Sequence, residues 1–188
     1  MDCKEEALRI MPYAIEFYGS KYKHIIEEVL DHTEFKILDD DANKHRQGGY
    51  FYKIIGMDFT HEIAMRNIED PLYRQAILTH ELFGHAVLSH EQPFTKIDGT
   101  LYIRNGICLR KCFGDEKSIN LMANEGMVEY IASHIMKLYE PSYKIRSKLF
   151  INEINSMFNL DTSIFITSCS VFSMFNSFSI IIVSDSSI

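Results

Sequence analysis

The stretch of residues 79–85 constrains this chain more than any other part, because it places His80, Glu81 and His85 inside an almost wholly apolar run over residues 76–88. Such a run predicts a largely buried helix. Two imidazoles and a carboxylate are costly to bury unless they are paired or bound to a metal. The pattern, His-Glu-x-x-x-His, is one residue longer than the zinc-binding His-Glu-x-x-His. Two interpretations stay open: a zinc-binding helix, or a pair of core histidines bonded to backbone carbonyls.

The extra residue between the two histidines matters for helix geometry. In a regular α-helix each residue turns by about 100°, so residues five apart point about 140° away from each other. His80 and His85 would then face different directions. A π-bulge, which is a single wide turn that absorbs one inserted residue, would bring them to the same side. We therefore expect a π-bulge within residues 78–86, with Gly84 as the position where backbone distortion costs least.

A second stretch, residues 118–139, reads as one helix that ends before Pro141. Two carboxylates, Glu125 and Glu129, fall on a stripe that is otherwise apolar. Carboxylates in an apolar stripe are costly unless they are paired or bind a metal. The alternative is a solvated pair of glutamates on a frayed helix.

The two stretches together resemble the gluzincins, zinc peptidases whose third ligand is a Glu on a second helix in the pattern N-E-x-x-x-D. Here residues 124–129 read Asn-Glu-Gly-Met-Val-Glu, with Glu in place of the final Asp. The pattern is most similar to the tyrosine carboxypeptidase family of microtubule-associated enzymes and its bacterial relatives, in which H-E-I-G-T-H is followed by E-G-L-A. The resemblance covers roughly residues 25–140. This chain departs from it at Gly84 and at Val128, which stands where the family has Ala.

This resemblance implies a fold, a cofactor and an activity. The fold is α+β, a gluzincin-like core with a small twisted sheet and two ligand-bearing helices. One Zn²⁺ ion is held by His80, His85 and Glu125. The chain would be a zinc-dependent metallopeptidase, specifically a carboxypeptidase that acts at the C terminus of a peptide or protein. Zinc-activated water would attack the peptide bond and Glu81 would act as general base, while Glu129 and Asn124 support the ligands from behind.

His90 is a rival third ligand, since His80, His85 and His90 recur at intervals of five. In the metzincin pattern a loop with a Gly brings the third His back, six residues after the second. Here the spacing is five and no Gly intervenes, which favours Glu125 over His90.

Residues 99–113 read as a β-hairpin around Asn105-Gly106, a dipeptide typical of a type I′ turn. The hairpin lies between the two predicted ligand helices, so it is expected to wall the cleft. Its surroundings are locally basic, which suits a substrate carboxylate or an acidic peptide; a hairpin solvated on all sides is the alternative. The candidate substrate-binding residues are Arg104, Arg110 and Lys111, and the candidate oxyanion donors are Tyr130, His134 and Arg104.

The rest of the chain predicts further helices and strands. Asp70 and Pro71 form a helix start, with Asp70 as N-cap, and Arg74 is expected on the outer face of that helix. His61-Glu62 also reads His-Glu, but no second His follows at the right distance. The predicted elements are helices over residues 4–31 divided near Gly19, strands over 34–38 and 49–57, the zinc helix over 71–90 and a helix over 144–160.

The composition excludes some classes of protein. A net charge of −7 argues against general nucleic-acid binding. The chain starts without an apolar secretory segment and has four cysteines without disulfide spacing, so a cytoplasmic location is expected. We expect a catalytic domain over residues 1–160. Residues 161–188, rich in Ser, Phe and Ile, are a strand pair, a tail anchor that makes the one expected membrane contact, or the artefact of a truncated reading frame.

An alternative function from another class also fits the sequence. The chain would then be a catalytically inactive zinc-binding remnant or a binding module that keeps the zinc helix but lacks the rest of the cleft.

Overall fold

The computed structural model describes residues 2–38, 47–55, 58–90, 94–111 and 118–143. All belong to a unit formed by Met1–Ser147, and a second unit comprises Lys148–Ile188. The predicted helix over residues 144–160 and the predicted boundary after residue 160 lie outside the described residues.

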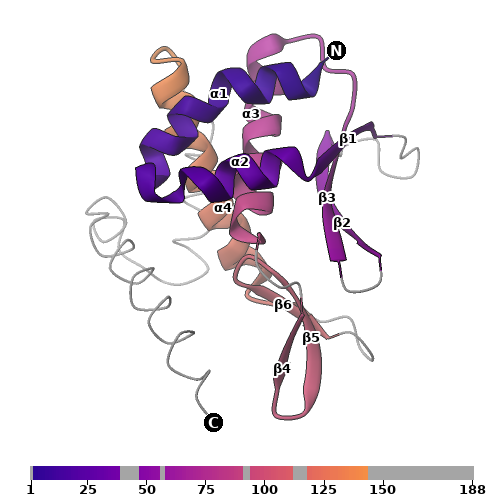
Figure 1. Ribbon diagram of the computed structural model, residues 1–188. Helices are drawn as coiled ribbons and strands as arrows, with labels where there is room; N and C mark the ends of the chain where they lie inside the picture. Colours follow the sequence, from indigo (N-terminus) through magenta and orange to yellow (C-terminus); the bar gives the residue numbers. More distant parts are fainter. Residues whose placement is uncertain (1, 39–46, 56–57, 91–93, 112–117, 144–188) are drawn as a thin grey trace. The chain divides into compact units, whose positions relative to one another are not determined.

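The chain begins with two helices that pack side by side (Figure 1). Helix α1 spans Cys3–Tyr18, a short 3₁₀ turn η1 spans Ser20–Tyr22, and α2 spans Lys23–Asp31. The predicted division near Gly19 is confirmed. Gly19 has a φ of +93°, a conformation that favours glycine over residues with a side chain.

A three-stranded sheet follows, in the order β1-β3-β2 (Figure 1). Strand β1 is Thr33–Ile37, β2 is Gly48–Ile55 and β3 is Asp58–Met65. β3 pairs parallel with β1 and antiparallel with β2. The first two strands match the predictions, but the central strand β3 was not predicted. His61 lies in β3, where its side chain is buried.

The predicted zinc helix is continuous from Pro71, with α3 at Pro71–Leu78 and a π-helix, η2, at Thr79–Ala86. Asp70 is the N-cap, since its carboxylate accepts hydrogen bonds from the N–H groups of Leu72 and Tyr73 at 3.0 and 3.2 Å. The expected wide turn is thus confirmed, although it extends over eight residues instead of one bulge.

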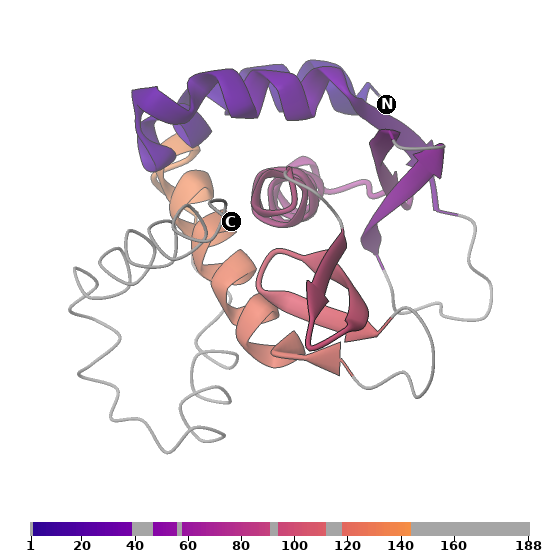
Figure 2. The ribbon, with the colours of Figure 1, turned by 60° about the horizontal axis from the view of Figure 1, so that its bottom comes forward.

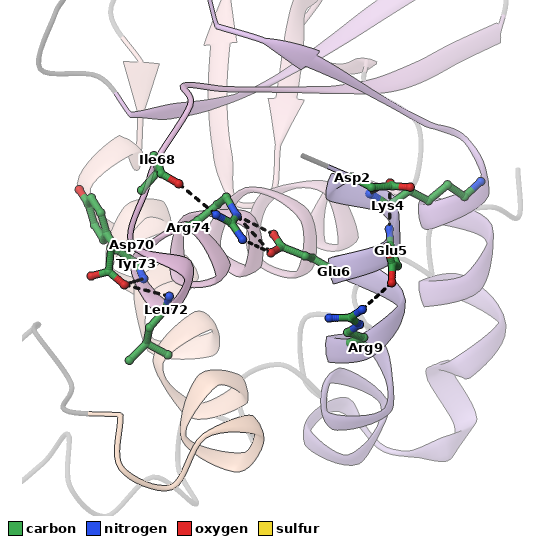
Figure 3. A network of polar contacts seen from close by, with 10 residues as sticks. All are labelled: Asp2, Lys4, Glu5, Glu6, Arg9, Ile68, Asp70, Leu72, Tyr73 and Arg74. Atoms are coloured by element: carbon green, nitrogen blue, oxygen red, sulfur yellow. Dashed lines mark hydrogen bonds and ion pairs between the residues drawn. The ribbon is translucent and has the colours of Figure 1, made fainter.

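Arg74 corrects the expectation that it lies on the outer face of this helix. Its guanidinium pairs with the carboxylate of Glu6 in α1 and also donates to the carbonyl of Ile68 at 3.0 Å (Figure 3). Both charged side chains are largely buried, so Arg74 joins α3 to α1 and is not a solvated residue.

A second, four-stranded antiparallel sheet has the order β4-β5-β6-β7. Its strands are β4 (Phe94–Ile97), β5 (Thr100–Asn105), β6 (Cys108–Lys111) and β7 (Ser118–Ile119). The predicted hairpin is present, but its turn is shifted by one residue, because Asn105 pairs with Cys108 and the loop is Gly106 and Ile107. Only Gly106 of these two has a positive φ, which excludes a type I′ turn and fits type II′.

The last described helix, α4, spans Leu121–Tyr139 and ends before Pro141, close to the predicted range. Figure 2 looks nearly along the α3–η2 helix, which lies at the centre with α1, α2, α4 and both sheets around it. The buried side chains of the core come from this helix, from α1, α2 and α4 and from the first sheet. The fold class is therefore α+β, as predicted. Among the described residues, no helix combines the length and apolar character needed to span a membrane.

Candidate metal centre

The π-helix brings His80 and His85 to the same side of η2. Their ring centroids lie 5.0 Å apart, with the ring planes at 69°. In a π-helix the backbone hydrogen bonds join residues five apart, so residues five apart lie on the same side of the helix. His80 and His85 therefore line the same pocket. The angular argument from the sequence therefore gives the right local structure.

Gly84 lies inside the π-helix, where the sequence places the backbone distortion, and it also has a packing role that was not predicted. A Cβ atom at position 84 would lie 2.4 Å from Cγ1 of Val128, which is fully buried in α4. Gly84 thus allows η2 and α4 to approach closely, and this approach brings the two ligand-bearing helices together.

Glu125 of α4 completes the group. Its Oε2 atom lies 3.6 Å from Nε2 of His80 and 3.3 Å from Nε2 of His85. One ligand atom from each of the three residues lies within 4.8 Å of the others, so the three could hold a metal ion. Two ligands of a tetrahedral zinc ion, each about 2.0–2.2 Å from the metal, lie about 3.3–3.6 Å apart. The donor set of two imidazoles and a carboxylate, and the spacing around Glu125, fit zinc.

Glu129 lies one helical turn after Glu125 and contacts the far side of His80. Its Oε2 atom is 3.1 Å from Nδ1 of His80, and its other oxygen accepts a hydrogen bond from the hydroxyl of Ser133 at 3.1 Å. A carboxylate at Nδ1 fixes the ring orientation and leaves Nε2 to face a metal. Ser133, which is buried, was not recognised from the sequence.

His85 is held between a ring and an amide. The ring of Tyr50, from β2, lies parallel to that of His85 with centroids 6.0 Å apart, and the Tyr50 hydroxyl bonds to Nδ1 of His61 at 3.0 Å. On the other side the side-chain amide of Asn124 lies 3.5 Å from Nδ1 of His85, and its oxygen accepts from the N–H of Ile107. Asn124 therefore touches a candidate ligand, as expected.

The ionisation of these groups reflects their mutual contacts. Burial alone would lower the pKa of His80, but its hydrogen bonds with Glu125 and Glu129 outweigh burial and raise the pKa to about 10. Burial would raise the pKa of Glu125, yet hydrogen bonds from His80 and His85 lower it to about 2. His80 and Glu125 thus each favour the charged form of the other.

A pocket of about 290 Å³ opens over these groups, lined by Gly48, Tyr50, His80, Glu81, His85, Asn105 and Glu125. Glu81 is therefore next to the candidate metal ligands without being one of them. A Cβ atom on Gly48 would lie 3.3 Å from Oε1 of Glu81, so strand β2 passes directly over this carboxylate. A larger depression, of about 500 Å³, lies between the start of α3 and the end of α4 and contains none of these residues.

The predicted basic residues divide between the two faces of the second sheet. Arg104 and Lys111 share one face, since Arg104 pairs with Leu109 and Tyr102 with Lys111, whereas Arg110 lies on the other face. The charge of Arg104 acts on Tyr50 and that of Arg110 on Cys108. None of the three is part of the pocket lining, and Lys111 is exposed.

Other predicted candidates lie away from the pocket. Tyr130 and His134, proposed as oxyanion donors, pack against Phe17 of α1. His90, the rival third ligand, donates from Nδ1 to the carbonyl of Val87 at 2.9 Å and is not part of the metal-binding group.

Three pocket residues were missed in the sequence: Gly48, Tyr50 and Asn105. The signals were present but indirect. Tyr50 lies on the strand predicted over residues 49–57. Gly48 precedes that strand directly and is two residues from Tyr50, so both belong to one face of β2, and Asn105 belongs to the hairpin that was expected to wall the cleft. Comparison of the chain with protein-family models, with curated protein sequences and with solved structures finds no match.

Proposed function

We propose that the chain is a zinc-dependent metallopeptidase of the gluzincin type. The observation that carries the proposal is the convergence of His80, His85 and Glu125 from two helices, with Glu81 in the same pocket. Three protein ligands leave one position open in a tetrahedral zinc site, as catalytic sites require. A structural site would have four protein ligands, and a fourth is not found among the described residues.

The chain differs from the resembled family at Gly84 and at Val128, and these two residues lie next to each other. Their contact supports the assignment. The family pattern H-E-I-G-T-H has Thr at the position of Gly84, and E-G-L-A has Ala at the position of Val128. In this chain the smaller residue is at 84 and the larger at 128, and Val128 fills the space that a side chain at 84 would need. The two exchanges thus compensate in volume, which is consistent with a close approach of η2 and α4 in this chain.

The residues have separate roles in the proposed hydrolysis. Zinc, when bound, would polarise the scissile carbonyl and lower the pKa of a water molecule. Glu81 takes a proton from that water as general base and passes it to the leaving amine. Glu129 holds the ring of His80, and Tyr50 and Asn124 hold that of His85.

A carboxypeptidase is the more specific form of the proposal. It rests on the motif resemblance and on two arginines of the second sheet: the charge of Arg104 acts on the pocket residue Tyr50, and that of Arg110 acts on Cys108. Either guanidinium suits a terminal carboxylate, since its N–H groups match a carboxylate in a bidentate manner. Arg104 is half-buried, whereas Arg110 and Lys111 are both exposed; Lys111 is the weakest of the three predicted partners because it also lies farther along β6 from the turn.

The test combines zinc stoichiometry with a cleavage assay on the full chain. A mixed pool of peptides with free C termini and a matched pool with amidated C termini are incubated with the zinc-loaded protein, and mass spectrometry identifies the products. We expect one zinc per chain and cleavage that prefers free C termini. Cleavage of both pools alike would keep the peptidase and reject the carboxypeptidase.

The alternative function makes a different prediction in the same experiment. A catalytically inactive remnant or a binding module would bind one zinc ion and cleave neither pool. Absence of zinc binding at the histidines would reject both functions.

A further inference from the structure

Asn105, the last residue of β5, enters the pocket from between the two ligand-bearing helices. Its side-chain oxygen accepts a hydrogen bond from the hydroxyl of Ser89 at 3.0 Å. Ser89, just after the helix, is buried, and its oxygen in turn accepts the N–H of Gly106 at 2.9 Å. Asn105 is thus a pocket residue whose amide is held from the buried side.

These contacts favour one orientation of the amide. The Ser89 oxygen accepts a backbone N–H, and the Ser89 hydroxyl, which also contacts the Tyr50 hydroxyl, donates to the Asn105 oxygen. The reversed amide would present donors to Ser89 and leave the hydroxyl proton without that partner. The amino group of Asn105 therefore points away from Ser89, and within the described ranges it has no hydrogen-bond partner in the protein.

Among the described residues, the other candidate side-chain donors either have a hydrogen-bond partner or lie outside the pocket lining. The hydroxyl of Tyr50 is bonded to His61, and Tyr130 and His134 pack against α1. Asn105 is left as a neutral N–H donor on a residue that lines the same pocket as Glu81 and the candidate ligands. Fixed donors of this kind stabilise an oxygen on which negative charge develops.

We infer that the side-chain amino group of Asn105 donates a hydrogen bond to the carbonyl oxygen of the scissile bond, and that Ser89 is the residue that positions it. The inference rests on the proposed peptidase function. When water adds to the carbonyl carbon, a C–O bond forms, the π electron pair moves onto the carbonyl oxygen, and the water proton passes to Glu81. Asn105 meets the oxygen that gains the charge, so it contributes more to the transition state than to substrate binding.

The test uses two zinc-binding peptide ligands of matched sequence on the zinc-loaded full chain. A phosphinic peptide carries a tetrahedral anion with an oxygen for Asn105, whereas a mercaptoacyl peptide binds zinc through sulfur and has no such oxygen. We expect Asn105→Ala to weaken binding of the phosphinic peptide by about 10- to 100-fold, as for a hydrogen bond to a charged group. Binding of the mercaptoacyl peptide and of zinc should not change.

Two further variants sharpen the result. Ser89→Ala removes the anchor and leaves Asn105 in place, so it should weaken the phosphinic peptide by a smaller factor and the mercaptoacyl peptide not at all. Asn67→Ala, at an exposed asparagine between β3 and α3, is the matched control and should change neither. In a cleaving chain, Asn105→Ala should lower kcat by about 10²- to 10³-fold with little change in KM.

Each contrary outcome is distinct. Equal weakening of both ligands, or loss of zinc, in Asn105→Ala would assign the residue a structural role and overturn the inference. Unchanged binding of the phosphinic peptide in Asn105→Ala would also overturn the inference, and the proposed peptidase function would stand if the parent chain cleaves peptides. If the parent chain cleaves no peptide, the proposed function fails, and the ratio of the two ligands still decides the role of Asn105. A zinc-loaded parent that binds neither ligand contradicts both.

Discussion

The hydroxyl of Tyr18 donates a hydrogen bond to the backbone carbonyl of Phe83 at 2.6 Å, which ties α1 to the middle of the π-helix. This carbonyl lies between the two candidate histidine ligands in sequence. Burial raises the pKa of Tyr18 well above its usual range, so the hydroxyl stays protonated and remains a donor. The wide turn that brings the histidines together is thus held by a residue far away in the sequence.

Replacement of Tyr18 by Phe should lower the free energy of unfolding by about 1–3 kcal/mol, the cost of leaving a buried hydrogen-bonding group without its partner. Urea denaturation of the metal-free chain measures the change. Tyr13→Phe is the matched control: the Tyr13 ring packs on Tyr139, and in the described part of the chain its hydroxyl makes no hydrogen bond. An equal effect of both substitutions would show that the bond to Phe83 contributes nothing specific.

The contact between Gly84 and Val128 predicts a compensating pair. Gly84→Ala alone should destabilise the fold by roughly 1–3 kcal/mol through overpacking, because its Cβ would lie 2.4 Å from Val128 Cγ1. Val128→Ala alone leaves a cavity. The double variant should be more stable than the sum of the single changes predicts, with a coupling of about 0.5–3 kcal/mol. Simple additivity in thermal or urea unfolding would contradict the packing role of Gly84.

The sequence predicts those parts of this fold that depend on local pattern. His80 and His85 lie five positions apart in an apolar run, which leaves a π-helical turn as the geometry that lets both face one metal. The capping pair Asp70-Pro71 and the break at Gly19 likewise mark element ends through backbone preferences that act within a few residues. These predictions needed no knowledge of what the helices pack against.

The missed features depend on contacts between distant segments. Strand β3 was not predicted because His61 and Glu62 interrupt its apolar pattern, and His61 meets its partner Tyr50 only once β2 pairs with β3. The turn holds Gly106 and Ile107 because Asn105 pairs with Cys108 and stays in the strand, where its side chain contacts Ser89. The loop between β4 and β5 is Asp98-Gly99, a dipeptide typical of a type I′ turn, and both residues have positive φ. This turn was not predicted.

His61 predicts a pH dependence of stability. Burial, together with the charges of His90 and His32, lowers the pKa of His61 from 6.5 to about 4. The unfolded chain therefore takes up a proton near pH 6.5 that the folded chain does not take up until about pH 4. The contribution of this histidine is fully present above pH 6.5 and is lost as the pH falls to 4, by roughly 3 kcal/mol at about 1.4 kcal/mol per pKa unit.

His61→Gln should flatten the fall in stability between pH 6.5 and pH 4, because glutamine does not titrate. Urea denaturation of the metal-free chain at several pH values gives the slopes. His24→Gln, at an exposed histidine of α2, is the control and should keep the slope of the parent. A slope in His61→Gln as steep as in the parent would assign the pH dependence to other groups.

Substitution of Glu129 should lower the affinity for zinc while all three candidate ligands remain in place. Glu129→Gln keeps the size of the side chain but weakens its contact with Nδ1 of His80, so zinc affinity should fall by about 10- to 100-fold. Competition with a chelator of known affinity measures this. At saturating zinc the stoichiometry should remain one. Glu140→Gln, on an exposed glutamate after α4, is the control and should bind zinc as the parent does.

Glu81 and Glu125 line the same pocket, and substitution of either should reduce cleavage, but the two variants should differ in zinc content. Glu81→Gln should leave zinc bound, because Glu81 is not among the three candidate ligands. It should reduce cleavage by at least the 10²- to 10⁴-fold that general-base catalysis typically contributes, since glutamine cannot take up the proton of the water. Glu125→Gln removes the charge that lies 3.3 Å from His85 and 3.6 Å from His80, so zinc content and cleavage should fall together.

Zinc stoichiometry and cleavage rate, measured on both variants with the fastest peptide of the free-terminus pool, separate the two roles. Cleavage by Glu81→Gln at the parental rate would refute the proposed mechanism, and full zinc retention by Glu125→Gln would remove this carboxylate from the ligand set.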